Sequence, residues 1–200
     1  MILEGLVTTT DPSGGMHLAA MGPTVDAGER AAGRLERLVL RPFPTSRTAA
    51  HLLRSQAGVF HLTDDPLLLA RVVAGRLPGP PAARSAERVA GFVLADCCRA
   101  YEFAVEQVDA SGPRLRLEAR VVAVHAGRPF LGFNRAAHAV VEAAILVTRL
   151  HLLDPADIRR RLDDLATLVE KTGGPREREA FGLLEDAAAG GAGRDGFSAG

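Results

Sequence analysis

The first two thirds of the chain alternate apolar and polar residues with the two-residue period of β-strands. Residues 2–10 and 16–25 are rich in apolar and β-branched residues, and the Pro/Gly/Ser segment 11–15 predicts a tight turn between them. Residues 34–40 alternate charged and apolar side chains, as a strand with one buried face does. A further short strand is predicted at residues 58–65.

Two longer strands follow in the same region. They are predicted at residues 98–109 and 114–125, and the segment "ASGP" predicts a hairpin between them. Between the short and the long strands, Pro66 is expected to open a helix capped by Asp64 or Asp65, and residues 75–87 are expected to form a loop.

The period changes at Asn134 from that of strands to that of helices. Three helices are predicted, the second opening at Asp154–Pro155 and the third at Pro175. The sequence therefore predicts a β domain at 1–133, a helical extension at 134–189 and a disordered tail at 190–200.

Composition and charge narrow the classes of function. The chain has 200 residues, 47% of them hydrophobic, and its 24 basic and 24 acidic side chains cancel. A general nucleic-acid or anionic-membrane binder would need a basic excess, and the 4% of aromatic residues offers no base-stacking platform. No apolar segment reaches the length of a membrane span, no signal peptide is recognisable, and the two cysteines are adjacent in sequence. We expect a soluble cytoplasmic protein, and the six histidines show no metal-ligand spacing.

The segment "RPFPTSRTAAHLL" at 41–53 is the strongest candidate for a binding site. Three hydroxyls and two arginines surround one helix start: Arg41, Thr45, Ser46, Arg47 and Thr48. A helix N-terminus offers unpaired N–H groups and a positive dipole end, so this group of residues is suited to a phosphate. The alternative is that Thr45 or Ser46 is only the N-cap and that the arginines are solvated.

A second candidate lies at the start of the predicted helix after residue 133. Asn134 is a good N-cap, whereas Arg135 in the first turn opposes the helix dipole. Arg135 is therefore either a contact for an anion, such as a substrate carboxylate or the cofactor of a facing subunit, or an ordinary surface arginine.

Five short motifs occur in an order that resembles a known family. They are "EGLVTT" at 4–9, "AAMG" at 19–22, "PFPTSRT" at 42–48, "TDD" at 63–65 and "GFNRA" at 132–136. The pattern resembles an uncharacterised archaeal and bacterial domain-of-unknown-function family of the FMN-binding split β-barrel superfamily. The flavin reductase-like and pyridoxamine-phosphate-oxidase-like proteins are known members of that superfamily.

The resemblance implies an α+β, mainly β fold: a split β-barrel with a helical C-terminal extension, forming a homodimer with FMN at the subunit interface. It implies that the FMN phosphate lies at the helix start, and that the flavin ring lies along the strand with the small residues. The residues implied in cofactor binding are Ala19, Ala20, Met21, Gly22, Arg41, Thr45, Ser46, Arg47, Thr48, His51, Asn134 and Arg135.

The implied function is that of a flavoprotein oxidoreductase acting on a small-molecule substrate or electron donor, with a link to methanopterin-type one-carbon metabolism. The residues identify no catalytic group. The alternative is a dimer that binds a flavin or another phosphorylated ligand without catalysis. Tight strand packing is the alternative reading of the small residues at 19–22, and core filling is that of Met21.

Overall fold

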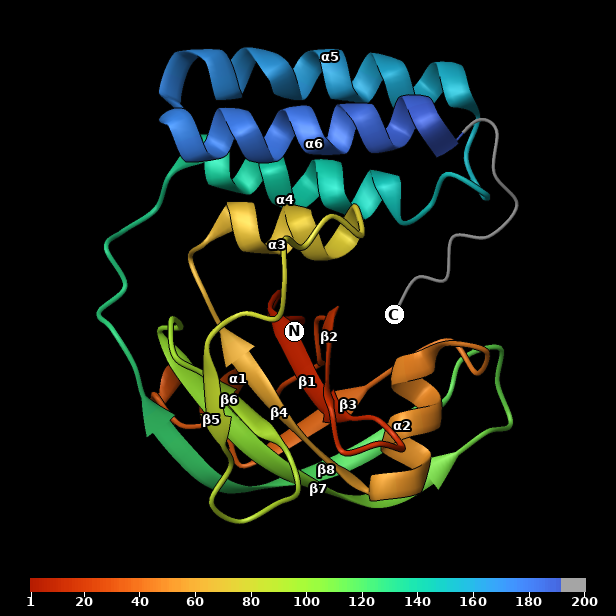
Figure 1. Cartoon of the computed structure of the whole chain (residues 1–200), viewed down its shortest axis with the longest axis vertical. Coiled ribbons are helices and arrows are strands. Elements are labelled where there is room, and N and C mark those ends of the chain that lie inside the picture. The colour runs from red at the N-terminus through yellow and green to blue at the C-terminus, as the bar shows by residue number, and fades with distance from the viewer. Residues whose placement is uncertain (192–200) are drawn as a thin grey trace. The chain divides into compact units, whose positions relative to one another are not determined.

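A computed structural model describes residues 1–191 and divides the chain into two compact units. The barrel unit comprises residues 1–63 and 80–129, and the described part of the helical unit comprises residues 64–79 and 130–191 (Figure 1). Of the tail predicted at 190–200, residues 192–200 lie outside the described part of the chain.

The barrel unit is built on one antiparallel six-stranded sheet with the order β2-β1-β4-β7-β8-β3. Its strands are β1 (Leu6–Thr10), β2 (Met16–Ala20), β3 (Arg37–Leu40), β4 (Ala57–Leu62), β7 (Arg99–Asp109) and β8 (Arg116–Ala126). Thr24 pairs with both Ile2 and Val39 and so connects the chain beyond β2 to β3 at the other edge of the sheet. Those two bridges close the sheet on itself at Thr24.

The barrel interior is apolar because every second residue of each strand faces it. Val7, Leu38, Phe60, Phe103 and Leu117 are completely buried there. Helix α2 (Arg47–Ser55) adds Ala49 and Leu52 to this core. The strand and hairpin predictions for this unit are thus confirmed, as is the helix after the Pro-rich segment.

A second, two-stranded ribbon covers one face of the sheet. It consists of β5 (Ala83–Ser85) and β6 (Phe92–Leu94), and it is held to β1 by hydrogen bonds from Thr8 Oγ1 to Phe92 O at 2.6 Å and from Thr10 Oγ1 to Ala90 O at 3.0 Å. The prediction of a loop over 75–87 was wrong at β5. All three β5 side chains are exposed, so the sequence carries no apolar period there. The short helix α1 (Ala27–Ala31), which has no buried residue, was missed for the same reason.

The helical unit contains α3 (Pro66–Val73), α4 (Arg135–Val147), α5 (Pro155–Thr172) and α6 (Pro175–Gly191). Asp65, Asn134 and Asp154 cap the first three of these helices with their side-chain oxygens, as their positions before helix starts predict. The sequence-based boundary at residue 133 left α3 in the β domain, whereas the compact helical unit includes α3. Among the described residues, no helix is both long and apolar enough to span a membrane.

Candidate functional site

Helix α2 begins at a Ser46 cap. Ser46 Oγ accepts a hydrogen bond from the amide of Ala49 at 3.1 Å and donates one to Phe43 O at 2.8 Å, and its side chain is buried. The carbonyl of Ser46 accepts from the amide of Ala50. Within the described residues, the cap therefore leaves the amides of Arg47 and Thr48 uncapped; Arg47 is exposed, whereas Thr48 is completely buried.

The chain that leads into α2 is held rigidly from one side. Arg114 stacks its guanidinium over the ring of Phe43 at 3.8 Å from the centroid and donates to the carbonyl of Arg41. The amide of Leu115 donates to Pro42 O. The side chains of Arg41, Thr45 and Arg47 are exposed around this fixed helix start.

A polar cluster of Thr9, His17, Thr48 and His51 lies behind the first turn of α2, and we name it the histidine cluster. Thr9 and His17 lie directly opposite each other on β1 and β2. His17 Nε2 is 3.1 Å from Thr48 Oγ1, and His51 Nδ1 is 3.1 Å from Thr9 Oγ1. The two imidazole rings meet edge to face with their centroids 4.9 Å apart.

Both histidines of this cluster are held in their neutral form. Burial, together with the charges of His51 and Arg47, lowers the pKa of His17 to about 4. Burial and the charge of Arg54 lower the pKa of His51 as well. Near pH 7 each ring therefore has one N–H donor and one acceptor nitrogen, and neither adds a positive charge.

The small residues of β2 have structural reasons for their size. Ala19 is 2% exposed and pairs with Val7. A Cβ at Gly22 would come within 2.6 Å of Ile2 Cγ2. Met21 is partly buried against the apolar core. Strand packing thus accounts for these residues, and Ala20 pairs with Leu6 beside them.

Asn134 and Arg135 belong to the helical unit, whereas the other predicted cofactor-binding residues belong to the barrel unit. Asn134 Oδ1 accepts from the amides of Ala136 and Ala137, and its Nδ2 donates to Thr172 O at the end of α5. Arg135 is exposed in the first turn of α4. Within the described residues, no three His, Cys, Asp or Glu side chains converge as a metal site would require.

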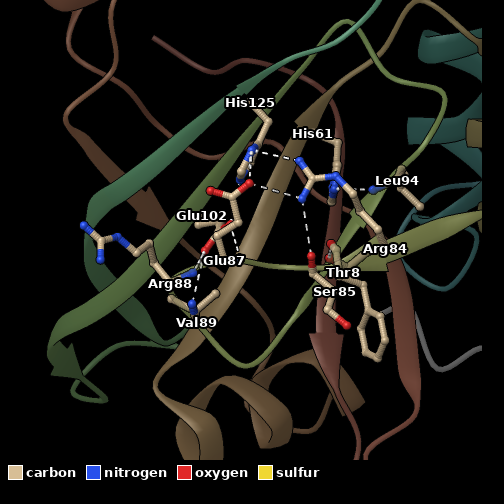
Figure 2. Close-up of polar contacts among 11 residues, drawn as sticks. Thr8, His61, Arg84, Ser85, Glu87, Arg88, Val89, Leu94, Glu102 and His125 are labelled. Carbon is tan, nitrogen blue, oxygen red and sulfur yellow. Dashed lines mark hydrogen bonds and ion pairs between the residues drawn. The ribbon is translucent and has the colours of Figure 1, made fainter.

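A second polar group, which we name the Glu102 network, lies between β7, β8 and the ribbon (Figure 2). Glu102 is completely buried and accepts from three main-chain amides, those of Glu87 at 2.7 Å, Arg88 at 2.6 Å and Val89 at 3.1 Å. Its Oε1 is also 2.6 Å from His125 Nε2. Burial would raise the pKa of Glu102, but the amide of Glu87, His125 and the amide of Arg88 together hold it below its usual value.

The sequence analysis did not predict the hydrogen-bond partners within the histidine cluster or within the Glu102 network. The hairpin turn at 11–15 fixes the register that brings Thr9 opposite His17, so counting outward from the turn could have paired them. Glu102 stands between Tyr101 and Phe103 in a strand whose inner face is apolar. A carboxylate in the middle of a strand that is covered on both faces is the signal that could have identified it.

Comparison with known proteins agrees with this architecture. A family model described as the N-terminal domain of the protein of unknown function DUF447 matches residues 3–128, and a DUF447 C-terminal model matches residues 134–186. An FMN-bound DUF447 protein of Methanosarcina mazei has a similar structure, with a TM-score of 0.77 and 21% identity over 93% of this chain and 94% of that chain.

Two further solved structures share the fold over a smaller part of the chain. An FMN-binding protein of Thermus thermophilus gives a TM-score of 0.51 at 18% identity, covering 64% of this chain and 75% of that chain. The styrene monooxygenase flavin reductase of Pseudomonas putida S12 gives 0.50 at 14% identity, covering 63% and 81%. The split-barrel fold with C-terminal helices is thus confirmed, and the two family models together span nearly the whole of the described chain. The protein belongs to the DUF447 family, whose fold is that of FMN-binding, flavin reductase-like proteins.

Proposed function

We propose that this protein binds FMN, with the 5′-phosphate at the N-terminus of α2. The observation that carries the proposal is the uncapped pair of amides at Arg47 and Thr48, in front of a helix start that Ser46 and Arg114 hold in place. The FMN-bound relative from Methanosarcina mazei supports the choice of cofactor.

The residues at this helix start fit a phosphate group. The two amides and the exposed guanidinium of Arg47 are donors, and Arg41 is an exposed second cation on the same segment. Thr48 is completely buried, and its hydroxyl, 3.1 Å from His17 Nε2, holds the first turn in place behind the proposed phosphate. Ser46 contributes by fixing the helix start, because both its donor and its acceptor are already engaged.

We further propose that the flavoprotein is an oxidoreductase of flavin reductase type that acts on a small molecule. Bound FMN supplies hydride and electron transfer, while the chain's residues bind the cofactor and orient it. The backbone of β2 along Ala19, Ala20, Met21 and Gly22 is the surface proposed for the flavin ring. The setting that the family resemblance suggests is methanopterin-type one-carbon metabolism, which assays with pterin substrates test directly.

We also propose a homodimer with the flavin at the subunit interface. Phe130, Leu131 and Phe133 are 52%, 87% and 85% exposed, and such a group of apolar side chains is typical of an interaction site. Asn134 and Arg135 follow directly, so Arg135 is proposed to meet the flavin of the facing subunit. Sedimentation of wild type and of Leu131→Ser tests this, with dissociation of a dimer as the expected effect of the substitution.

The cofactor proposal is tested by the visible absorption spectrum of the purified protein, before and after FMN is added and the protein is desalted. Wild type is expected to retain a flavin spectrum, and Arg47→Gln combined with Arg41→Gln, which changes exposed side chains only, to lose it. Arg159→Gln, an exposed arginine of α5, is the matched control and retains the spectrum. Ser46→Ala is not a clean test, because removing the cap also destabilises α2. A wild-type protein that fails to retain FMN overturns the proposal.

A non-catalytic flavin carrier is the alternative, since the sequence identifies no catalytic group. Oxidation of NADH or NADPH by the FMN-loaded protein separates the two functions. Turnover that is lost in the double variant supports the reductase, whereas a loaded protein without turnover with either donor supports the carrier.

A further inference from the structure

We propose that Arg84 forms a second, separate binding site, for a small-molecule carboxylate, on the outer face of the barrel sheet. This site does not depend on the flavin proposal. Figure 2 shows Arg84 of the ribbon extending over His125, which in turn contacts the buried Glu102.

Glu102 and His125 together orient the guanidinium of Arg84. Glu102 is ionised and accepts hydrogen bonds only, so His125 Nε2 carries the proton that lies between them. The ring's Nδ1 is then an acceptor, and Arg84 Nη2 donates to it at 2.9 Å. His125 and Glu102 are positioning residues, because they hold Nη2 of Arg84 in place from a side chain that is 10% exposed and one that is completely buried.

The other terminal nitrogen, Arg84 Nη1, donates to Ser85 O at 3.4 Å and also faces a carboxylate of the chain itself. Glu87 Oε1 is 3.5 Å from Arg84 Nη1 and 3.6 Å from His125 Nδ1. The Glu87 side chain is 62% exposed, so this contact is one that solvent screens and a competitor can displace. The external carboxylate is therefore proposed to lie where the Glu87 carboxylate now lies, because Glu87 occupies that position weakly.

The planar arginine fork selects the ligand class. A planar guanidinium that His125 and Ser85 O hold in one orientation matches the two coplanar oxygens of a carboxylate better than it matches a spherical anion. Arg84 is 51% exposed on a strand whose side chains all face solvent, so a small carboxylate reaches it without opening the fold.

The site lies on the opposite face of β1 from the histidine cluster. Thr9 contacts His51, whereas Thr8 and Thr10 hydrogen-bond to the segment that carries β6. Because successive side chains of a strand point to opposite faces, a ligand at Arg84 does not compete with one at α2.

The experiment is an NMR titration of the 15N-labelled full chain at pH 7 and constant ionic strength, with the His125 ring nitrogens as probe and sodium acetate as ligand. Glu87→Ala removes the internal competitor and leaves the main-chain amide that Glu102 needs. This variant is expected to give a saturable His125 shift with acetate binding about two- to fivefold tighter than in wild type. Glu36→Ala, an equally exposed carboxylate paired with Arg34, is the matched control and should behave as wild type.

Combining Glu87→Ala with Arg84→Gln is expected to abolish the saturable shift. A shift that survives this second substitution overturns the proposal, as does the lack of any saturable shift in Glu87→Ala. Equal binding of chloride or inorganic phosphate would also overturn the assignment to carboxylates. The fluorescence of the single tyrosine, Tyr101, which is buried in the barrel core, reports whether each variant is folded.

Discussion

Replacing Glu102 by Gln is expected to cost the barrel unit about 3 kcal/mol of unfolding free energy. The two carboxylate oxygens divide four donors between them: Oε1 faces the Glu87 amide and His125, while Oε2 faces the amides of Arg88 and Val89. A glutamine has one acceptor oxygen, so its NH₂ group must face one of these pairs and leave at least one buried amide unpaired. A hydrogen bond to a charged group contributes about 1.5–3 kcal/mol, and the remaining bonds weaken when the charge is removed.

The assay is urea unfolding followed by tyrosine fluorescence. The chain has one tyrosine and no tryptophan, so Tyr101, 3% exposed beside Glu102, reports the barrel unit alone. Glu106→Gln on the same strand is the matched control. Its carboxylate is 38% exposed in an ion pair with Arg120, so its loss is expected to cost less than about 1 kcal/mol.

The effect of Glu102→Gln is expected to depend on pH with a defined sign. The pKa of Glu102 is lowered in the folded state, so the stability that its charge contributes is present above the ordinary value of 4.5 and is lost as pH falls through the folded pKa. The loss of unfolding free energy caused by Glu102→Gln should therefore become smaller below pH 4.5. This account of the Glu102 network would be refuted if Glu102→Gln lost no more unfolding free energy than Glu106→Gln, or if its loss were unchanged at pH 3.5.

Three further predictions concern the histidines and the helix cap. The free protein should lose stability between pH 6.5 and 4.5, because burial lowers the pKa of His61, and of His17, to about 4 and the unfolded chain binds these protons more tightly. The full shift at the buried His61 corresponds to about 3 kcal/mol, measurable by urea unfolding at several pH values. FMN affinity should rise more steeply in wild type than in His17→Asn when the pH is lowered from 7 to 5, because a nearby phosphate favours protonated His17. The same pH dependence of FMN affinity in both proteins would contradict this. Ser46→Ala should lower stability by about 1 kcal/mol, whereas exposed Thr45→Ala should change it little, as thermal melts of the FMN-free variants can check.

The regular elements could be predicted where burial imposes a period. The strand at 116–126 alternates where one face lines the core, and α3, α4 and α5 begin at Asp or Asn caps that the sequence displays. The ribbon strand β5 could not be predicted in this way, because its three side chains are exposed and main-chain pairing with β6 defines it.

The candidate site could be predicted only as far as local sequence determines it. The helix start at Ser46 follows from the cap residue and the prolines before it, both of which are local signals. The part played by His17 depends on the pairing of β1 with β2 and on the approach of α2, residues 31 positions away along the chain. Arg84 and His125 are likewise 41 residues apart, and no local pattern marks their contact.

The three threonines at 8–10 lie on β1 between the proposed flavin site at α2 and the proposed carboxylate site at Arg84. In a strand covered on both faces, an apolar run would be the usual sequence, because buried hydroxyls need partners. Here Thr9 finds its partner in His51 on one face, and Thr8 and Thr10 find main-chain carbonyls on the other. Each hydroxyl is therefore hydrogen-bonded on one face of β1 only, and the strand separates the two sites. Loss of carboxylate binding at Arg84 and loss of flavin binding at α2 should then be independent, since no side chain of this strand takes part in both.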